Sequence, residues 1–216
     1  MPIEPVATCV VAVLALLVAE RRRSSPGRWL AKPVASASFV ALALMCGALD
    51  TSYGRCILLA LAASLVGDVL LIPVDRPRAF RAGVLAFMAA HAAFIVAFLA
   101  RPIRIGAVVA AACALSLVLW VAWRWMRRLV PPDFRGPVAA YLVVIGAMAA
   151  CAVGVTAAGG PVSVAAAAIA FAASDLSVAR DRFVAPGFVN QAWGLPLYYA
   201  AQLLFAASTA APSWRV

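Results

Sequence analysis

Long hydrophobic stretches, separated by short polar segments, run along the whole chain. A helix that crosses the hydrocarbon core of a bilayer needs about 20 apolar residues, whereas a barrel strand needs only about ten of alternating polarity. Continuous apolar runs of the helical length therefore indicate helices. The pattern predicts an all-α, polytopic integral membrane protein with about eight transmembrane helices, over residues 6–19, 33–49, 55–73, 80–99, 103–123, 137–157, 162–179 and 191–210.

The composition agrees with this class. The chain has 216 residues, of which 66% are hydrophobic and 12% are charged. Soluble domains contain about 45–50% apolar and about 25% charged residues. No long linker and no polar block interrupts the hydrophobic pattern. We therefore expect a single transmembrane helical domain over residues 1–216.

A weak internal repeat divides the predicted domain into two halves, residues 1–101 and 102–216. Asp68 precedes His91 by 23 residues, and Asp175 precedes Tyr198 by the same 23 residues. Both halves run in the same direction, which predicts a parallel four-plus-four duplication with a site between the halves. The alternative is a chance similarity between alanine-rich helices.

The basic residues are distributed unevenly between the predicted loops. The formal net charge is +10, and 14 of the 18 basic residues lie between spans one and two or after spans three, five and seven. The other side has only Arg55, Arg101, Arg104 and Arg215. This positive-inside pattern predicts a plasma-membrane protein with both termini outside and basic loops in the cytoplasm. Loops of this kind suit anionic lipid head groups and not a nucleic-acid partner.

Two acidic residues, Asp68 and Asp175, are the only ones placed well inside predicted spans. A charged side chain in hydrocarbon is unfavourable, so such residues usually face a cavity or a partner. Asp68 lies seven residues before Asp75, which is about 10 Å along a helix, and Asp175 lies five residues before Arg180. If the two carboxyl groups meet, one should stay protonated and the other ionised, as general acid and base catalysis requires. The alternative is a structural pairing with Lys32, His91 or an interfacial arginine.

Two basic side chains are candidates for the same site. Lys32 precedes Pro33 at the predicted cytoplasmic start of span two, where it could hold a phosphate, pair with an aspartate or anchor the helix. His91 is the only histidine and lies mid-span in span four. It is either a hydrogen-bonded core residue or a reactive one. A lone histidine without a nearby cysteine or glutamate predicts no metal site.

Several uncharged polar side chains also lie in predicted spans. Tyr141 is one turn into span six, where an interfacial aromatic residue is the simpler interpretation. In span eight, Gln191, Tyr198 and Gln202 follow one helical face, and Tyr199 lies just beside it. These groups must find partners inside a bundle. They either bind substrate or hold helices together.

Short motifs recur in a fixed order and spacing along most of the chain. They are SLVGDVLL at 64–71, FRAG at 80–83, FMAAH at 87–91, FAASD at 171–175, RF at 182–183 and YYAAQLL at 198–204. The pair Lys32–Pro33 and the spacing from Pro137 to Tyr141 fit the same pattern. Together these segments resemble the YhhN-like lysoplasmalogenase family from about residue 32 to residue 204.

This resemblance implies a function. Characterised members of the family are multi-pass membrane proteins that hydrolyse the vinyl ether bond of lysoplasmalogens, giving a fatty aldehyde and a glycerophospho-ethanolamine or -choline. The resemblance implies a catalytic pair, Asp68 and Asp175, a lysophospholipid substrate and no cofactor. The residues expected to contact the substrate are Lys32, His91, Tyr141, Tyr198, Tyr199 and Gln202.

Two carboxyl groups suit this chemistry. A protonated carboxyl can protonate the alkene carbon remote from oxygen, and an ionised one can stabilise the resulting cation and activate water. Depth in the predicted span favours Asp68 as the acid. The alternatives are a proton-coupled transporter and a non-catalytic lipid-binding protein. The sequence does not define an oligomeric state.

Overall fold

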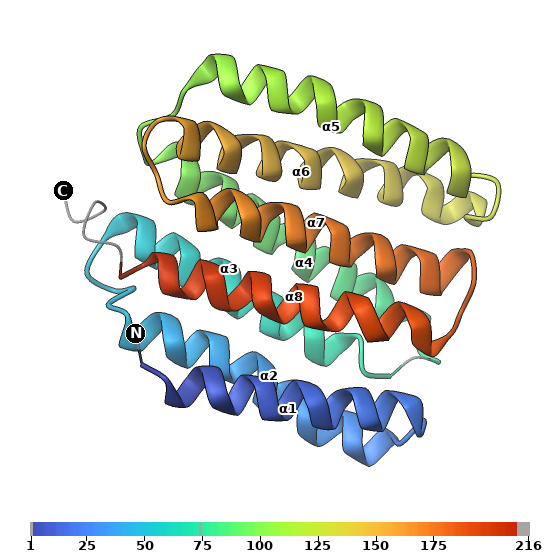
Figure 1. Ribbon diagram of the computed structural model, residues 1–216. Coiled ribbons are helices and arrows are strands. Elements are labelled where there is room, and N and C mark those ends of the chain that lie inside the picture. Colours follow the sequence, from blue (N-terminus) through green and yellow to red (C-terminus); the bar gives the residue numbers. More distant parts are fainter. Residues whose placement is uncertain (1, 74, 211–216) are drawn as a thin grey trace.

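The computed structural model describes residues 2–73 and 75–210, and this part of the chain folds into one bundle of eight helices without strands (Figure 1). The helices are α1 (Glu4–Arg21), α2 (Ser25–Met45), α3 (Ser52–Leu70), α4 (Pro77–Leu99), α5 (Ile105–Met126), α6 (Pro132–Ala157), α7 (Val162–Phe183) and α8 (Phe188–Ser208). The predicted all-α fold is confirmed.

Five of these helices, α3 to α7, are long and apolar enough to span a membrane. The other three are more polar. Helix α1 carries Glu4, Glu20 and Arg21 at its ends, α2 carries Arg28 and Lys32, and α8 carries several amide and phenol side chains. Five of the eight predicted spans thus coincide with helices that have the length and composition of a membrane span. The count of eight spans stays a prediction.

Two predicted helix starts were wrong. We expected spans two and six to begin at Pro33 and Pro137, but both prolines lie inside helices. Helix α2 begins at Ser25. The side chain of Ser24 caps this helix by accepting a hydrogen bond from the backbone N–H of Gly27 at 3.2 Å. A proline inside a membrane helix is tolerated where neighbouring groups satisfy the freed backbone carbonyl. The extension places Lys32 within α2.

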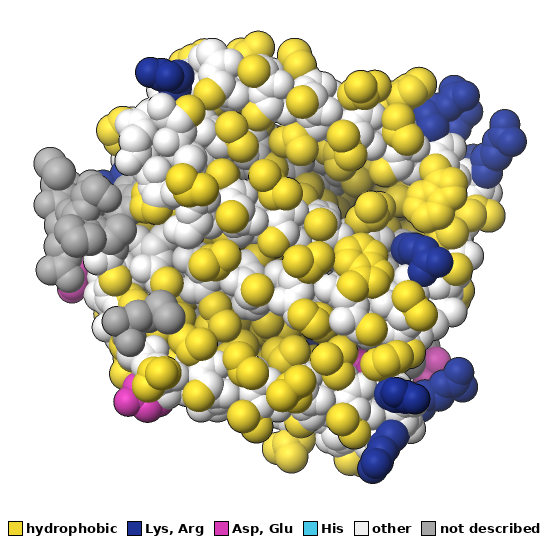
Figure 2. Space-filling model, in the orientation of Figure 1, with side chains coloured by type: hydrophobic (Ala, Val, Ile, Leu, Met, Phe, Trp, Pro, Cys, Tyr) yellow, Lys and Arg dark blue, Asp and Glu magenta, His cyan; other side chains and the backbone are white. Residues whose placement is uncertain are grey.

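Successive helices run antiparallel and form four hairpins, α1–α2, α3–α4, α5–α6 and α7–α8 (Figure 1). Helix α2 packs on α3 and α8, while α6 packs on α7 and α4. The hairpin turns all lie at one end of the bundle, and the described chain begins and ends at the other (Figure 1). Lysine and arginine side chains gather at the turn end (Figure 2), which we call the basic end.

The basic end agrees with the uneven loop charges in the sequence. Of the four basic residues predicted on the opposite side, Arg215 lies outside the described residues. Which end faces the cytoplasm stays a prediction.

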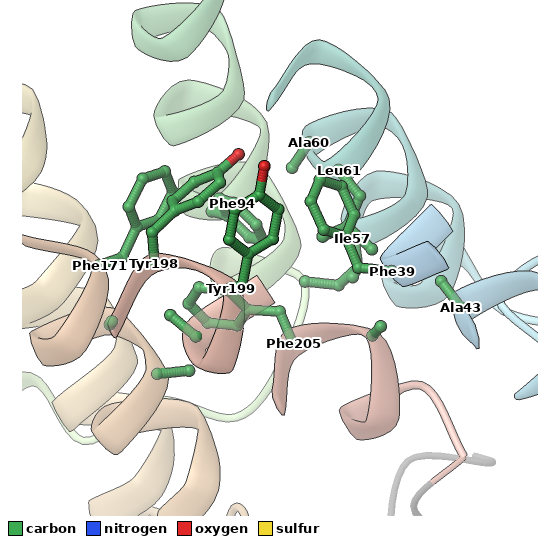
Figure 3. Close-up of a cluster of buried hydrophobic side chains, with 14 of the residues drawn as sticks. Phe39, Ala43, Ile57, Ala60, Leu61, Phe94, Phe171, Tyr198, Tyr199 and Phe205 are labelled. Atoms are coloured by element: carbon green, nitrogen blue, oxygen red, sulfur yellow. The ribbon is translucent and has the colours of Figure 1, made fainter. Parts of the chain in front are cut away.

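Helix α8 lies at the centre of an aromatic core. Its neighbouring residues Tyr198 and Tyr199 point their hydroxyl groups to the same side (Figure 3), with ring centroids 4.8 Å apart. Phe171 of α7 packs 5.4 Å from Tyr198, and Phe39 of α2 packs 6.2 Å from Tyr199. Close packing of aromatic rings fixes both phenols in position.

The closest approach of α7 and α8 depends on Gly194. A Cβ atom at this position would overlap the side chain of Ser177, which is buried in α7. We expect Gly194→Ala to lower the free energy of unfolding by about 1–3 kcal/mol because it overpacks this contact. Gly106→Ala is the matched control, since a Cβ at Gly106 meets nothing within 4 Å. Equal stability of both variants, measured by thermal unfolding in detergent, would contradict this packing.

Candidate active site

One large cavity with a volume of about 960 Å³ contains both intramembrane carboxyl groups. Asp68 from α3 and Asp175 from α7 line its wall, together with Tyr198 from α8. Ligand pockets usually measure about 300–1,000 Å³, so this cavity has room for a large ligand. The sequence predicted that these two carboxyl groups face a common pocket, and the structure brings them together.

Asp68 is 3% exposed and is surrounded by hydrogen-bond donors. Its Oδ2 atom accepts hydrogen bonds from the hydroxyl groups of Ser36 at 2.7 Å and Tyr198 at 2.6 Å. The ammonium group of Lys32 lies 3.3 Å from its Oδ1 atom. Lys32 and Ser36 are four residues apart on α2 and therefore share one helical face. An ammonium and two hydroxyl donors are the surroundings of an ionised carboxylate.

Asp175 has different neighbours. The hydroxyl group of Tyr141 donates to its Oδ2 atom at 3.3 Å, and Nε2 of His91 lies 3.3 Å from the same oxygen. The side chain of Asp175 is 12% exposed and that of His91 is fully buried. The imidazole also packs against the ring of Phe171 at 4.5 Å between centroids. Among the described residues, no lysine or arginine forms a salt bridge with this carboxyl group.

The two carboxyl groups occupy matching places in the bundle. Asp68 on α3 receives contacts from α2 and α8, and Asp175 on α7 receives contacts from α6 and α4. A shift of four helices along the chain, counting on from α8 to α1, converts α2, α3 and α8 around Asp68 into α6, α7 and α4 around Asp175. Tyr198 on α8 donates a hydrogen bond to Asp68 and is also close enough to Asp175 to interact with its charge. The cavity therefore has two similarly built but chemically distinct sides.

One part of the cavity wall, which we call the apolar arm, is formed by side chains of α5, α6 and α7. It consists of aliphatic side chains, namely Leu115, Val118, Leu119, Leu142, Ile145 and Ile169. No charged side chain belongs to this part of the wall. Such a lining suits a long hydrocarbon chain and excludes a polar ligand.

At the basic end the cavity opens past two arginines. The guanidinium of Arg81 lies 5.0 Å from the ring centroid of Phe134, and that of Arg182 lies 4.5 Å from the ring centroid of Phe80. Both arginines line the cavity. Aromatic faces hold guanidinium groups by cation–π attraction, and a guanidinium group is well suited to bind an anion.

An acidic side chain also lines the same opening. Glu20, in the last turn of α1, lies 3.9 Å from Arg28. Burial raises the pKa of Glu20, and the positive charges of Arg28 and Lys32 partly oppose this shift. The opening thus combines basic and acidic groups, as binding of a zwitterionic head group requires.

The predicted substrate-contact residues fall into two groups. Lys32, Tyr141 and Tyr198 line the cavity. The other three are buried behind its wall: His91 contacts Asp175, Tyr199 lies 3.3 Å from Ser36, and the amide of Gln202 donates to Ser64 at 3.3 Å. Direct substrate contact by all six residues stays a prediction.

Sequence reasoning missed some functional residues. Ser36 contacts Asp68, and its position one turn after Lys32 was the available signal. Arg81 and Arg182 were recognised as basic loop residues and as parts of the FRAG and RF motifs, but not as residues that line the cavity. No group of three or more His, Cys, Asp or Glu side chains lies together in the part of the chain described here.

The fold and the site together define a class: an all-helical protein with helices long and apolar enough to span a membrane, in which two carboxyl groups line one large cavity. The YhhN family matches residues 27–209, so the chain belongs to the YhhN family. The resemblance found in the sequence motifs is thereby confirmed. Comparisons with curated proteins and with solved structures gave no match.

Proposed function

We propose that this protein hydrolyses the vinyl ether bond of lysoplasmalogen-type lysophospholipids. The observation that supports this most strongly is the pair Asp68 and Asp175, which face one cavity but have different partners. One carboxyl group has an ammonium neighbour, and the other has an imidazole. Membership of the YhhN family is consistent with this reaction.

The reaction needs only an acid, a base and water. One carboxyl group protonates the alkene carbon remote from the ether oxygen, which gives an oxocarbenium ion. The ionised carboxylate stabilises this cation and takes a proton from the water that attacks the carbon bound to oxygen. The hemiacetal formed then collapses to a fatty aldehyde and a glycerol alcohol. Two carboxyl groups on opposite sides of a sugar ring serve glycosidases in the same way.

The shape of the cavity supports the substrate class. The apolar arm between α5, α6 and α7 suits the alkenyl chain, and the opening at the basic end suits a charged head group. Asp175 and Arg182 are seven residues apart on α7, which is about 10 Å along the helix axis. Since the long arginine side chain covers part of this distance, we infer that a glycerophosphate fits with its ether at the carboxyl groups and its phosphate at Arg81 and Arg182.

The matching surroundings of the two carboxyl groups also support a parallel repeat of four helices. Helices α2, α3 and α8 around Asp68 correspond to α6, α7 and α4 around Asp175. A duplication of this kind explains why the site lies between the halves. We propose that the first half acquired both Lys32, beside Asp68, and His91, beside Asp175, so that the carboxyl groups took different roles.

Purified protein in detergent tests the proposed function directly. It should release fatty aldehyde from a lysoplasmalogen and leave an ester lysophospholipid of the same chain length and head group intact. An ester lysophospholipid cleaved to fatty acid, with the vinyl ether untouched, would contradict the proposal. Substrate uptake into sealed vesicles without any aldehyde would instead favour a transporter.

The two arginines at the opening should control substrate affinity. We expect Arg81→Gln and Arg182→Gln each to raise KM for a lysoplasmalogen about tenfold, since a hydrogen bond to a charged group contributes about 1.5 kcal/mol. The value of kcat should change little, and an alkenylglycerol without phosphate should be unaffected. Arg78→Gln is the matched control, because Arg78 is exposed at the same end but does not line the cavity. An equal effect on both substrates would refute the phosphate assignment.

A further inference from the structure

The position of His91 determines which of its ring nitrogens carries a proton. Its Nδ1 atom lies 2.6 Å from the backbone carbonyl oxygen of Phe87, one turn earlier in α4. A carbonyl oxygen can only accept a hydrogen bond, so Nδ1 must be the donor and must carry a hydrogen. The tautomer with a bare Nδ1 is therefore excluded. The protonation of Nε2 then depends on what faces it.

The atom that faces Nε2 is an oxygen of Asp175. The distance is 3.3 Å, within the range of an ion pair, and Nε2 is buried without a hydrogen-bond partner among the described residues. A bare Nε2 and an ionised carboxylate are both acceptors and would repel each other. The contact is favourable only if one of the two groups carries an additional proton. Either the carboxyl group of Asp175 is protonated, or His91 is an imidazolium.

The other side chains around Asp175 do not provide a positive charge that could replace this proton. Tyr141 from α6 and Tyr198 from α8 are neutral phenols, and Lys32 from α2 is paired with Asp68 of α3. Arg81 and Arg182 lie at the opening, on the rings of Phe134 and Phe80. Without the extra proton, a buried negative charge at Asp175 would have no paired cation, which is strongly unfavourable.

We propose that Asp175 and His91 share one proton at neutral pH and that Asp175 delivers it to the alkene carbon, whereas Asp68 stays ionised. The delivery step rests on the proposed function; the shared proton does not. This assignment is the opposite of the one favoured by depth in the sequence. His91 does not line the cavity and acts through Asp175, as a positioning residue that keeps the proton in place.

The proton balance closes over one turnover. Asp175 gives its proton to the alkene carbon, and the carboxylate of Asp68 takes one from the attacking water as the new carbon–oxygen bond forms. In the collapse of the hemiacetal, Asp68 returns its proton to the departing glycerol oxygen. Asp175 takes the proton of the hemiacetal hydroxyl group as the carbonyl forms. Both carboxyl groups are then back in their starting states, and one water has been consumed.

Spectroscopy of the wild-type protein tests the shared proton without any turnover. Since His91 is the only histidine, ¹⁵N-labelled histidine reports on this side chain alone. We expect a protonated Nδ1 together with one of two results. Either Nε2 is protonated as well, or Nε2 is bare and an infrared carboxylic-acid band is present that disappears in Asp175→Asn but persists in Asp68→Asn. A bare Nδ1, or a bare Nε2 without such a band, would overturn the proposal.

Kinetics test whether the shared proton is used. We expect His91→Gln to lower kcat about 100-fold, as loss of acid catalysis does, and to leave KM within about twofold. Arg78→Gln is the control and should keep full kcat, because Arg78 is exposed and does not line the cavity. Full kcat in folded His91→Gln would sink the delivery step. Spectra that show the shared proton in a protein that releases no aldehyde would instead refute only the proposed function.

Discussion

Replacing Asp68 or Asp175 with asparagine should lower aldehyde release by about 10²–10⁴-fold, the range that general acid–base catalysis contributes. Asparagine keeps the size of the side chain but neither holds nor accepts the transferred proton. Both residues line the cavity from different helices, so each variant removes one side of the site. Aldehyde formation from a lysoplasmalogen, followed over time at saturating substrate, measures the effect.

The control for these variants is Asp75→Asn, at an exposed position between α3 and α4. It removes the same charge near the basic end and should retain full activity. Folding of each variant is checked by its thermal unfolding in detergent. If Asp68→Asn or Asp175→Asn stayed fully active, the carboxylate mechanism would be wrong. If both merely unfolded the bundle, a non-catalytic lipid-binding role would be favoured.

The second large effect concerns the buried pair of Lys32 and Asp68. Lys32→Met should lower the free energy of unfolding by about 3–5 kcal/mol, because it leaves a buried carboxylate without its cation. The ammonium and the carboxylate are 3.3 Å apart, and their side chains are only 13% and 4% exposed. The same variant should lose most of its activity, since Asp68 avoids the isolated charge by taking up a proton. Thermal unfolding and aldehyde release measure the two losses.

A double variant separates pairing from packing. Lys32→Met combined with Asp68→Asn removes both charges, so most of the lost stability should return while activity stays absent. If the two single losses simply added, the residues would not be coupled and the pair would have no structural role. If Lys32→Met changed neither stability nor activity, the conclusion that Lys32 keeps Asp68 ionised would be wrong.

Much of the site followed from the sequence because charge is costly inside hydrocarbon. Asp68 and Asp175 were identified on that basis, and both line the cavity. Their partners were harder to predict. Hydropathy describes one segment at a time, while the contacts of Asp68 and Asp175 join helices distant in the chain.

The helix boundaries, like the site, were only partly predictable from the sequence. Hydrophobic runs placed α4 and α7 well, but α2 begins eight residues before the predicted Pro33. Polar residues such as Arg28 hid its first two turns, because a hydropathy pattern reports apolar length and not helical hydrogen bonding. The error mattered, because Lys32 and Ser36 reach Asp68 from one face only if the helix is continuous through the proline.

The role of His91 could not be predicted at all from the sequence. A single histidine in an apolar span is equally compatible with a core residue and a reactive one. The decisive facts are two distances, from Nδ1 to the carbonyl oxygen of Phe87 and from Nε2 to Asp175. Only three-dimensional packing provides them, and the proposed assignment of one acid and one base rests on both distances.

Hydrolysis in heavy water tests most directly whether carboxyl groups protonate carbon in this cavity. The aldehyde, reduced to its alcohol as it forms so that later exchange is prevented, should carry one deuterium atom on the carbon next to the former carbonyl. That atom comes from the acid that attacks the alkene. Aldehyde released without deuterium at this carbon would contradict the account.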